Sequence, residues 1–139
     1  MAIDVTLLKT RAECDQVTSA LADRITTLTK RQTDLTYSAA TATERAQGYS
    51  DELTDLVADI AADDAAIPTL TAGSERRLAR EDRRRKTNDR REEVLALQRE
   101  LGGAAAVLRQ SELKETEGRI ASIEADVALV AAHKPTLSA

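Results

Sequence analysis

Aromatic residues are nearly absent from this sequence, which has no Trp, no Phe and only two Tyr in 139 residues. Ordinary globular cores and most small-molecule pockets depend on aromatic side chains, so the composition argues against both. A single Cys excludes an intramolecular disulfide, and a single His excludes a metal site built on two histidines. No phosphate-binding glycine loop or zinc-ligand spacing is present either. We therefore expect no cofactor, no metal and no enzymatic activity.

Turn-forming residues and long apolar runs are also scarce. Five Gly and two Pro leave little material for the turns of a many-stranded β fold. No apolar run approaches the roughly 20 residues needed to span a bilayer. The N-terminal segment carries Asp4, Glu13 and Asp15, where a secretory signal would be apolar. We expect no membrane association and a cytoplasmic location by default, with signal-independent export or a virion as open alternatives.

The few helix-breaking residues divide the chain into two long segments. Pro68 and Pro135 each lack an amide donor and clash with the preceding turn, so a helix should end before each of them. Gly73 followed by Ser74 is typical of a loop and a helix N-cap. The pattern predicts an all-α fold with helices over residues 4–66 and 75–133, a turn over 67–74 and a tail over 134–139.

The first predicted helix carries a heptad seam. Residues recurring every seven positions form the d row of a left-handed coiled coil: Leu7, Cys14, Leu21, Leu28, Leu35, Ala42, Tyr49 and Leu56. A companion a row runs from Arg11 to Ile60. We expect Cys14 to be a buried core residue, and Tyr37 and Tyr49 to fill the helix interface.

The second predicted helix has two apolar seams. One comprises Val94, Leu97, Leu101, Ala104 and Leu108, and the other comprises Leu113, Thr116, Ile120, Ile123, Val127 and Val130. The step between them is too long for one continuous seam, so the register should slip near Gly102 and Gly103. The single His133 falls in the last turn, where a cation suits the helix dipole.

Charge is distributed unevenly along the chain. No Lys or Arg lies between Ala46 and Ser74, whereas nine basic residues lie between Arg76 and Arg91. If the chain folds back near residue 71, Asp59 faces Arg83, and the acidic end of the first helix lies along the basic start of the second. This complementarity predicts an antiparallel coiled-coil hairpin and helps to fix its register.

A lone hairpin leaves much of its apolar edge exposed, which favours assembly into a four-helix or larger bundle. We predict an oligomer interface at Leu53, Leu56, Val57 and Ile60. A second surface, an ion-pair face or a partner-binding face, comprises Arg76, Arg80, Arg83, Arg84 and Arg90. The leading interpretation is a non-enzymatic structural protein that self-assembles into a homo-oligomer or filament.

The alternative is a charged helical adaptor that binds another helical protein or nucleic acid through the Arg76–Arg91 face. Acidic residues interrupt this face and no aromatic residue lies within it, which argues against nucleic acid. The layout of two long helices and a short turn resembles that of bacterial appendage filament subunits and of small secreted helical-hairpin proteins. The turn lacks the Trp-x-Gly motif of the latter, so no functional residue is transferred.

An internal repeat is also visible. Residues 52–72 align without gaps to residues 119–139, at an offset of 67 and with eight identities that include Pro-Thr-Leu. The repeat predicts a tandem duplication. The alternative is that two unrelated Ala-rich helices have converged on the same helix-terminating sequence, Pro-Thr-Leu.

Overall fold

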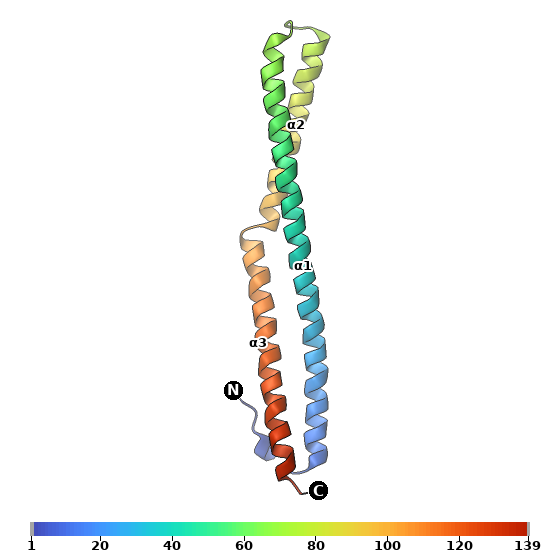
Figure 1. The fold of residues 1–139 in the computed structure, drawn as a ribbon, viewed down its shortest axis with the longest axis vertical. Coiled ribbons are helices and arrows are strands. Elements are labelled where there is room, and N and C mark those ends of the chain that lie inside the picture. Colours follow the sequence, from blue (N-terminus) through green and yellow to red (C-terminus); the bar gives the residue numbers. More distant parts are fainter. Residues whose placement is uncertain (1, 139) are drawn as a thin grey trace. The chain divides into compact units, whose positions relative to one another are not determined.

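The computed structural model describes residues 2–138, which are all-α and contain no strand (Figure 1). The α-helices are α1 (Arg11–Ala66), α2 (Glu75–Leu101) and α3 (Ala104–His133), and short 3-10 helices span Val5–Leu7, Ile67–Thr69 and Lys134–Thr136. The predicted helical hairpin is confirmed. Its contacts form two units, one comprising residues up to Ser38 and from Leu108 onward, and the other comprising residues 39–107.

The first helix begins at Arg11, and not near residue 4 as the pattern predicted. A capping box fixes this start: the Thr10 hydroxyl accepts from the Glu13 N–H at 3.2 Å, and the Glu13 carboxylate accepts from the Thr10 N–H at 2.9 Å. Upstream, Asp4 caps the short 3-10 helix by accepting from the Thr6 N–H. Leu7 therefore lies outside the helix and is 73% exposed, so its assignment to the seam was wrong.

The predicted turn between the two long segments is confirmed. The helix α1 ends at Ala66, a 3-10 helix carries Pro68, and Gly73 has a φ of 75°, a left-handed conformation that favours glycine. Ser74 then caps α2 by accepting from the Arg77 N–H at 3.3 Å. Local sequence chemistry alone therefore positions the start of the basic helix.

The second predicted helix is two helices, α2 and α3, separated at Gly102 and Gly103. The Gly102 N–H donates to the Gln98 carbonyl at 3.2 Å, which closes α2, and Gly103 has a φ of 55°. The predicted register slip is thus a break in the helix. The seam from Val94 ends at Leu101, because Leu108 is 69% exposed beyond the break.

The core follows the predicted seams but is thin. From Cys14 to Leu56, every position of the d row is buried or half-buried, and the same holds for the predicted seam of α3. The buried apolar residues of the described chain are few: Cys14, Leu21, Ala42, Val94 and Val130. Tyr49 is half-buried, but Tyr37 is 74% exposed, so its predicted place in the interface was wrong. Because each of two paired helices buries only one stripe of residues, most seam residues remain partly exposed to solvent.

Candidate functional site

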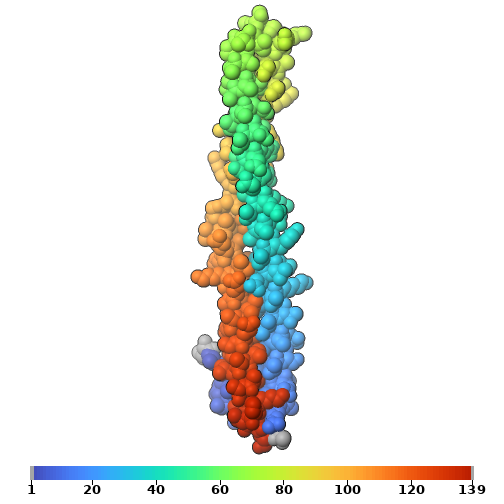
Figure 2. All heavy atoms as spheres, in the orientation of Figure 1, coloured from blue at the N-terminus to red at the C-terminus, as the bar shows by residue number. Residues whose placement is uncertain are grey.

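The candidate site lies in the unit of residues 39–107, where the start of α2 packs along the end of α1. Figure 2 shows the atoms of these two segments, in green and yellow, lying against each other. The Arg90 guanidinium donates to both carboxylate oxygens of Glu52, at 2.7 and 3.2 Å. The predicted pair of Asp59 and Arg83 is present at 3.9 Å. The acidic and basic segments are therefore in the predicted antiparallel register.

Most of the basic face is paired within the chain. Arg80 pairs with Asp63, Arg84 with Asp64, and Arg90 with Glu52 and Glu93. Arg77, Arg85 and Lys86 pair with acidic residues on their own helix. Of the nine basic residues in this stretch, only Arg76 and Arg91 make no ion pair within residues 2–138.

These pairs alter the titration of the groups that form them. The hydrogen bond from Arg84 lowers the pKa of the Asp64 carboxyl below its usual value, and the same contact raises the pKa of Arg84. Hydrogen bonds from Lys86 and Arg85 lower the pKa of Asp82. Each pair therefore favours the charged form of its carboxyl, as an ion-paired helix face requires.

Asp63 is the most unusual residue of the site, because its side chain is 0% exposed. Its Oδ1 accepts from the Arg80 Nε at 2.8 Å, and its Oδ2 lies 3.6 Å from the Arg83 Nε. The sequence predicted that Asp59 faces Arg83, but the predicted d row ended at Leu56. One more heptad step leads to Asp63, so continuing the row past its last apolar residue would have identified this buried carboxylate.

The four residues predicted as an oligomer interface do not share one open surface in this unit. Leu53, Leu56 and Ile60 are half-buried, whereas Val57 is 52% exposed. Leu56 lines a groove with Arg83 and Arg90, and Val57 and Ile60 line another groove with Arg84 and Arg91. Arginine side chains therefore border the apolar seam in both grooves, and Val57 remains the most accessible of the four.

No protein-family model, curated protein or solved structure matches this chain. Within residues 2–138, no helix combines the length and apolar character needed to cross a membrane, and no three His, Cys, Asp or Glu residues gather as metal ligands would. The structural evidence on function is therefore the arrangement of the helices and their charges.

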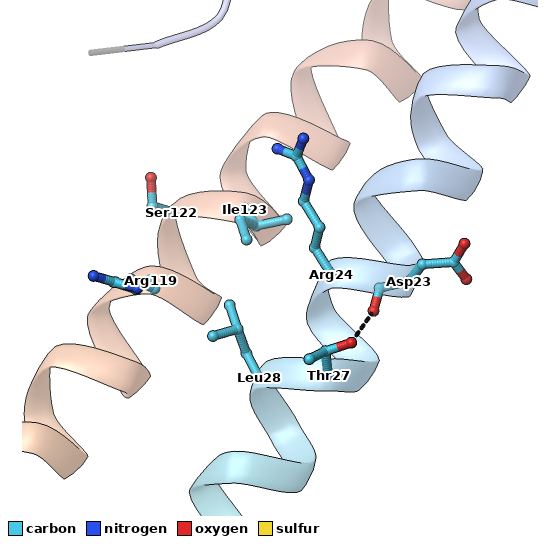
Figure 3. Close-up of a pocket in the computed structure, with 7 residues that line it drawn as sticks. All are labelled: Asp23, Arg24, Thr27, Leu28, Arg119, Ser122 and Ile123. Atoms are coloured by element: carbon cyan, nitrogen blue, oxygen red, sulfur yellow. Dashed lines mark hydrogen bonds between the residues drawn. The ribbon is translucent and has the colours of Figure 1, made fainter.

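The other unit carries a shallow apolar groove of about 530 Å³ between α1 and α3. Leu28 and Ile123 project toward each other across it, and Arg24 and Arg119 flank them (Figure 3). The groove is a part of the seam that the two helices leave uncovered. Both apolar residues belong to the predicted seams, but periodicity did not show how much of each would remain accessible.

Two further residues of this unit have structural contacts. Cys14 is fully buried, as its place on the d row predicted. The His133 Nε2 lies 3.1 Å from the Leu8 carbonyl, so this ring holds the segment before α1 against the end of α3. Nearby, the Arg11 Nε donates to the Leu137 carbonyl at 3.2 Å, and Lys134 pairs with Asp15.

Proposed function

We propose that the protein is a non-enzymatic structural protein whose helical hairpins self-associate. The observation that carries this proposal is the large accessible surface of the chain, 9770 Å² for a mass of 15.1 kDa. A compact monomer of this mass exposes about 7,100 Å². The excess, roughly 2,700 Å², is more than a standard protein–protein interface buries in total, which is about 1,600 Å².

The apolar residues left in solvent support the same proposal. Tyr37, Val57, Val107 and Leu108 are each more than half exposed, whereas only five apolar residues are buried in the described chain. Packing a second hairpin against the first would bury a second stripe on each helix, as in four-helix bundles. A homo-oligomer or a filament would both satisfy this requirement.

The pairing of the basic face favours assembly over the adaptor hypothesis. A nucleic-acid surface uses arginines to neutralise phosphates. Here Arg80, Arg83, Arg84 and Arg90 already face carboxylates of α1. Binding phosphates would require breaking these pairs, which adds a cost to that function.

The mass of the purified protein, measured by light scattering over a range of concentrations, tests the proposal. We expect a discrete oligomer, or a mass that rises with concentration. A helical protein that remains monomeric at high micromolar concentration would contradict self-association.

Val57→Asp tests the predicted interface within the same measurement. An exposed position tolerates Asp in a single hairpin, but burying that charge in an interface without a partner is costly. We expect Val57→Asp to lower the mass while circular dichroism still reports the helices. Ala58→Asp is the matched control, since Ala58 is exposed and lies on the helix face opposite the seam; its mass should equal that of the unmodified protein.

A further inference from the structure

Asp63 occupies a position where a coiled coil normally places an apolar side chain. It follows Leu56 by one heptad on the d row, and its side chain is fully buried. A carboxylate in this position must find a cation, because an unpaired buried charge is strongly disfavoured. Arg80 supplies that cation through a hydrogen bond of 2.8 Å, and Arg83 lies on the other carboxylate oxygen at 3.6 Å.

The Asp63 carboxylate is not fully hydrogen-bonded. The Asp63 Oδ2 has no hydrogen-bond partner within the described residues, although it is buried. A leucine in this position would need neither a cation nor a hydrogen-bond donor. Asp63 is therefore a poor choice if stability alone determined the residue. Polar residues at core positions of coiled coils are known to specify register and partner at some cost in stability.

The sequences of α1 and α2 show which alternative helix pairings would leave Asp63 without its present partners. A slip of α2 by one heptad would place Thr87 or Gly73 where Arg80 now lies, and Arg90 or Arg76 where Arg83 now lies. The Asp63 Oδ1 would then lose its arginine donor. The end of a second copy of α1 offers no cation either, because no Lys or Arg lies between Ala46 and Ser74. Of these arrangements, the observed register is the one that places an arginine at each Asp63 oxygen.

We propose that Asp63 determines which helix pairs with the end of α1. It favours the antiparallel register in which each carboxylate oxygen has an arginine, over an α2 slipped by one heptad and over the end of a second α1. This role does not depend on self-association, since it concerns the pairing of helices within one chain.

Distance measurements between two spin labels test the proposal. The labels are attached to cysteines that replace the exposed Ala62 and Ala79, in a chain carrying Cys14→Ala. Labelled chains are diluted with unlabelled chains of the same variant, so that only distances within one chain are read. The variants are Asp63→Leu, which removes the requirement for a cation, and Asp63→Asn, which keeps a polar group of the same shape. Asp64→Leu is the matched control, because Asp64 pairs with Arg84 from a half-exposed position.

We expect one narrow distance distribution for the chain with Asp63 and for Asp64→Leu. For Asp63→Asn we expect a broader one, because the neutral amide needs no cation. For Asp63→Leu we expect a helical protein with a broad or multiple distribution, because several registers become acceptable. A single unchanged distance in Asp63→Leu would overturn the proposal. Loss of helical signal in Asp63→Leu would also overturn it, by assigning Asp63 to stability, as would the absence of a short distance in the chain with Asp63.

Discussion

Glu13 holds two backbone amides that would otherwise lack partners at the start of α1. Its carboxylate accepts from the Lys9 N–H at 2.7 Å and from the Thr10 N–H at 2.9 Å. These bonds lower the pKa of Glu13 below its usual value, the bond from Lys9 contributing most. A group with a lowered pKa in the folded state stabilises the fold above its unfolded pKa and loses that contribution as the pH falls.

We therefore expect the start of α1 to loosen as the pH falls below about 4, where glutamate in unfolded chains becomes protonated. The amide shifts of Lys9 and Thr10, followed by NMR, should titrate with a midpoint below that of an exposed glutamate. Glu13→Gln keeps an acceptor without the charge and should abolish the titration of both amides. If both amides still titrate in Glu13→Gln, another carboxylate is responsible.

Single residues also show where periodicity succeeds and where it fails. It predicted burial of Cys14, but also placed Leu7 in the seam, because it could not register that the Thr10 and Glu13 capping box starts the helix later. That box is visible in the sequence as Thr-x-x-Glu. Asp63 was left out because the row was followed only while its residues stayed apolar.

At the scale of the helices, the glycines have two different roles. Gly73 and Gly103 have left-handed φ values and form the turn and the break. Gly48 and Gly118 lie inside α1 and α3, and a Cβ atom added at either would meet nothing within 4 Å. The sequence predicted a register slip near Gly102 and Gly103, but it could not tell that the helix would break there.

We expect Gly48→Ala and Gly118→Ala to stabilise the protein by about 1 kcal/mol each, since Ala in a helix loses less conformational entropy than Gly. Gly73→Ala and Gly103→Ala should each destabilise it by about 1 kcal/mol or more, because an L residue is strained at these φ values. Urea unfolding followed by circular dichroism measures all four. Equal effects at the helical and left-handed positions would contradict this assignment.

The two segments that end the long helices share one local structure, and the tandem duplication stays a prediction. In each, the Thr hydroxyl donates to the carbonyl three residues earlier at 2.6 Å: Thr69 to Ala66 and Thr136 to His133. The Leu70 and Leu137 carbonyls each accept from an arginine at the start of a neighbouring helix, Arg77 and Arg11 respectively. Proline and threonine chemistry made both stops predictable, whereas the arginine contacts depend on tertiary packing.

At the scale of the whole molecule, the two units differ in what holds their helices together. The unit of residues 39–107 has four acidic residues of α1 paired with arginines of α2. The other unit buries Cys14, Leu21 and Val130 and has fewer pairs between its helices. The charge contrast in the sequence predicted this difference, although it could not show which pair would be buried.

Raising the salt concentration should therefore loosen residues 39–107 selectively. At 1 M salt the screening length falls to about 3 Å, which weakens pairs that remain partly exposed, such as Asp59 with Arg83. Apolar burial is not weakened by salt in this way, so the unit containing Leu21 and Val130 should keep its protection. Hydrogen exchange at low and high salt measures both units in one sample, and uniform protection at both salt concentrations would refute the expectation.

A charge-swap cycle isolates one of these pairs. Asp59→Lys places a cation opposite Arg83 and should accelerate exchange in residues 39–107. Asp59→Lys combined with Arg83→Asp restores an ion pair of opposite orientation, but should recover only part of the loss, because Arg83 also lies 3.6 Å from the buried Asp63 Oδ2. Asp51→Lys is the matched control, because it changes the net charge equally at an exposed position whose recorded side-chain contact is with Gln47 of the same helix. If the control loosens the unit as much as Asp59→Lys does, the effect comes from net charge. Recovery in the double variant alone would show that the facing pair between Asp59 and Arg83 holds this part of the hairpin together.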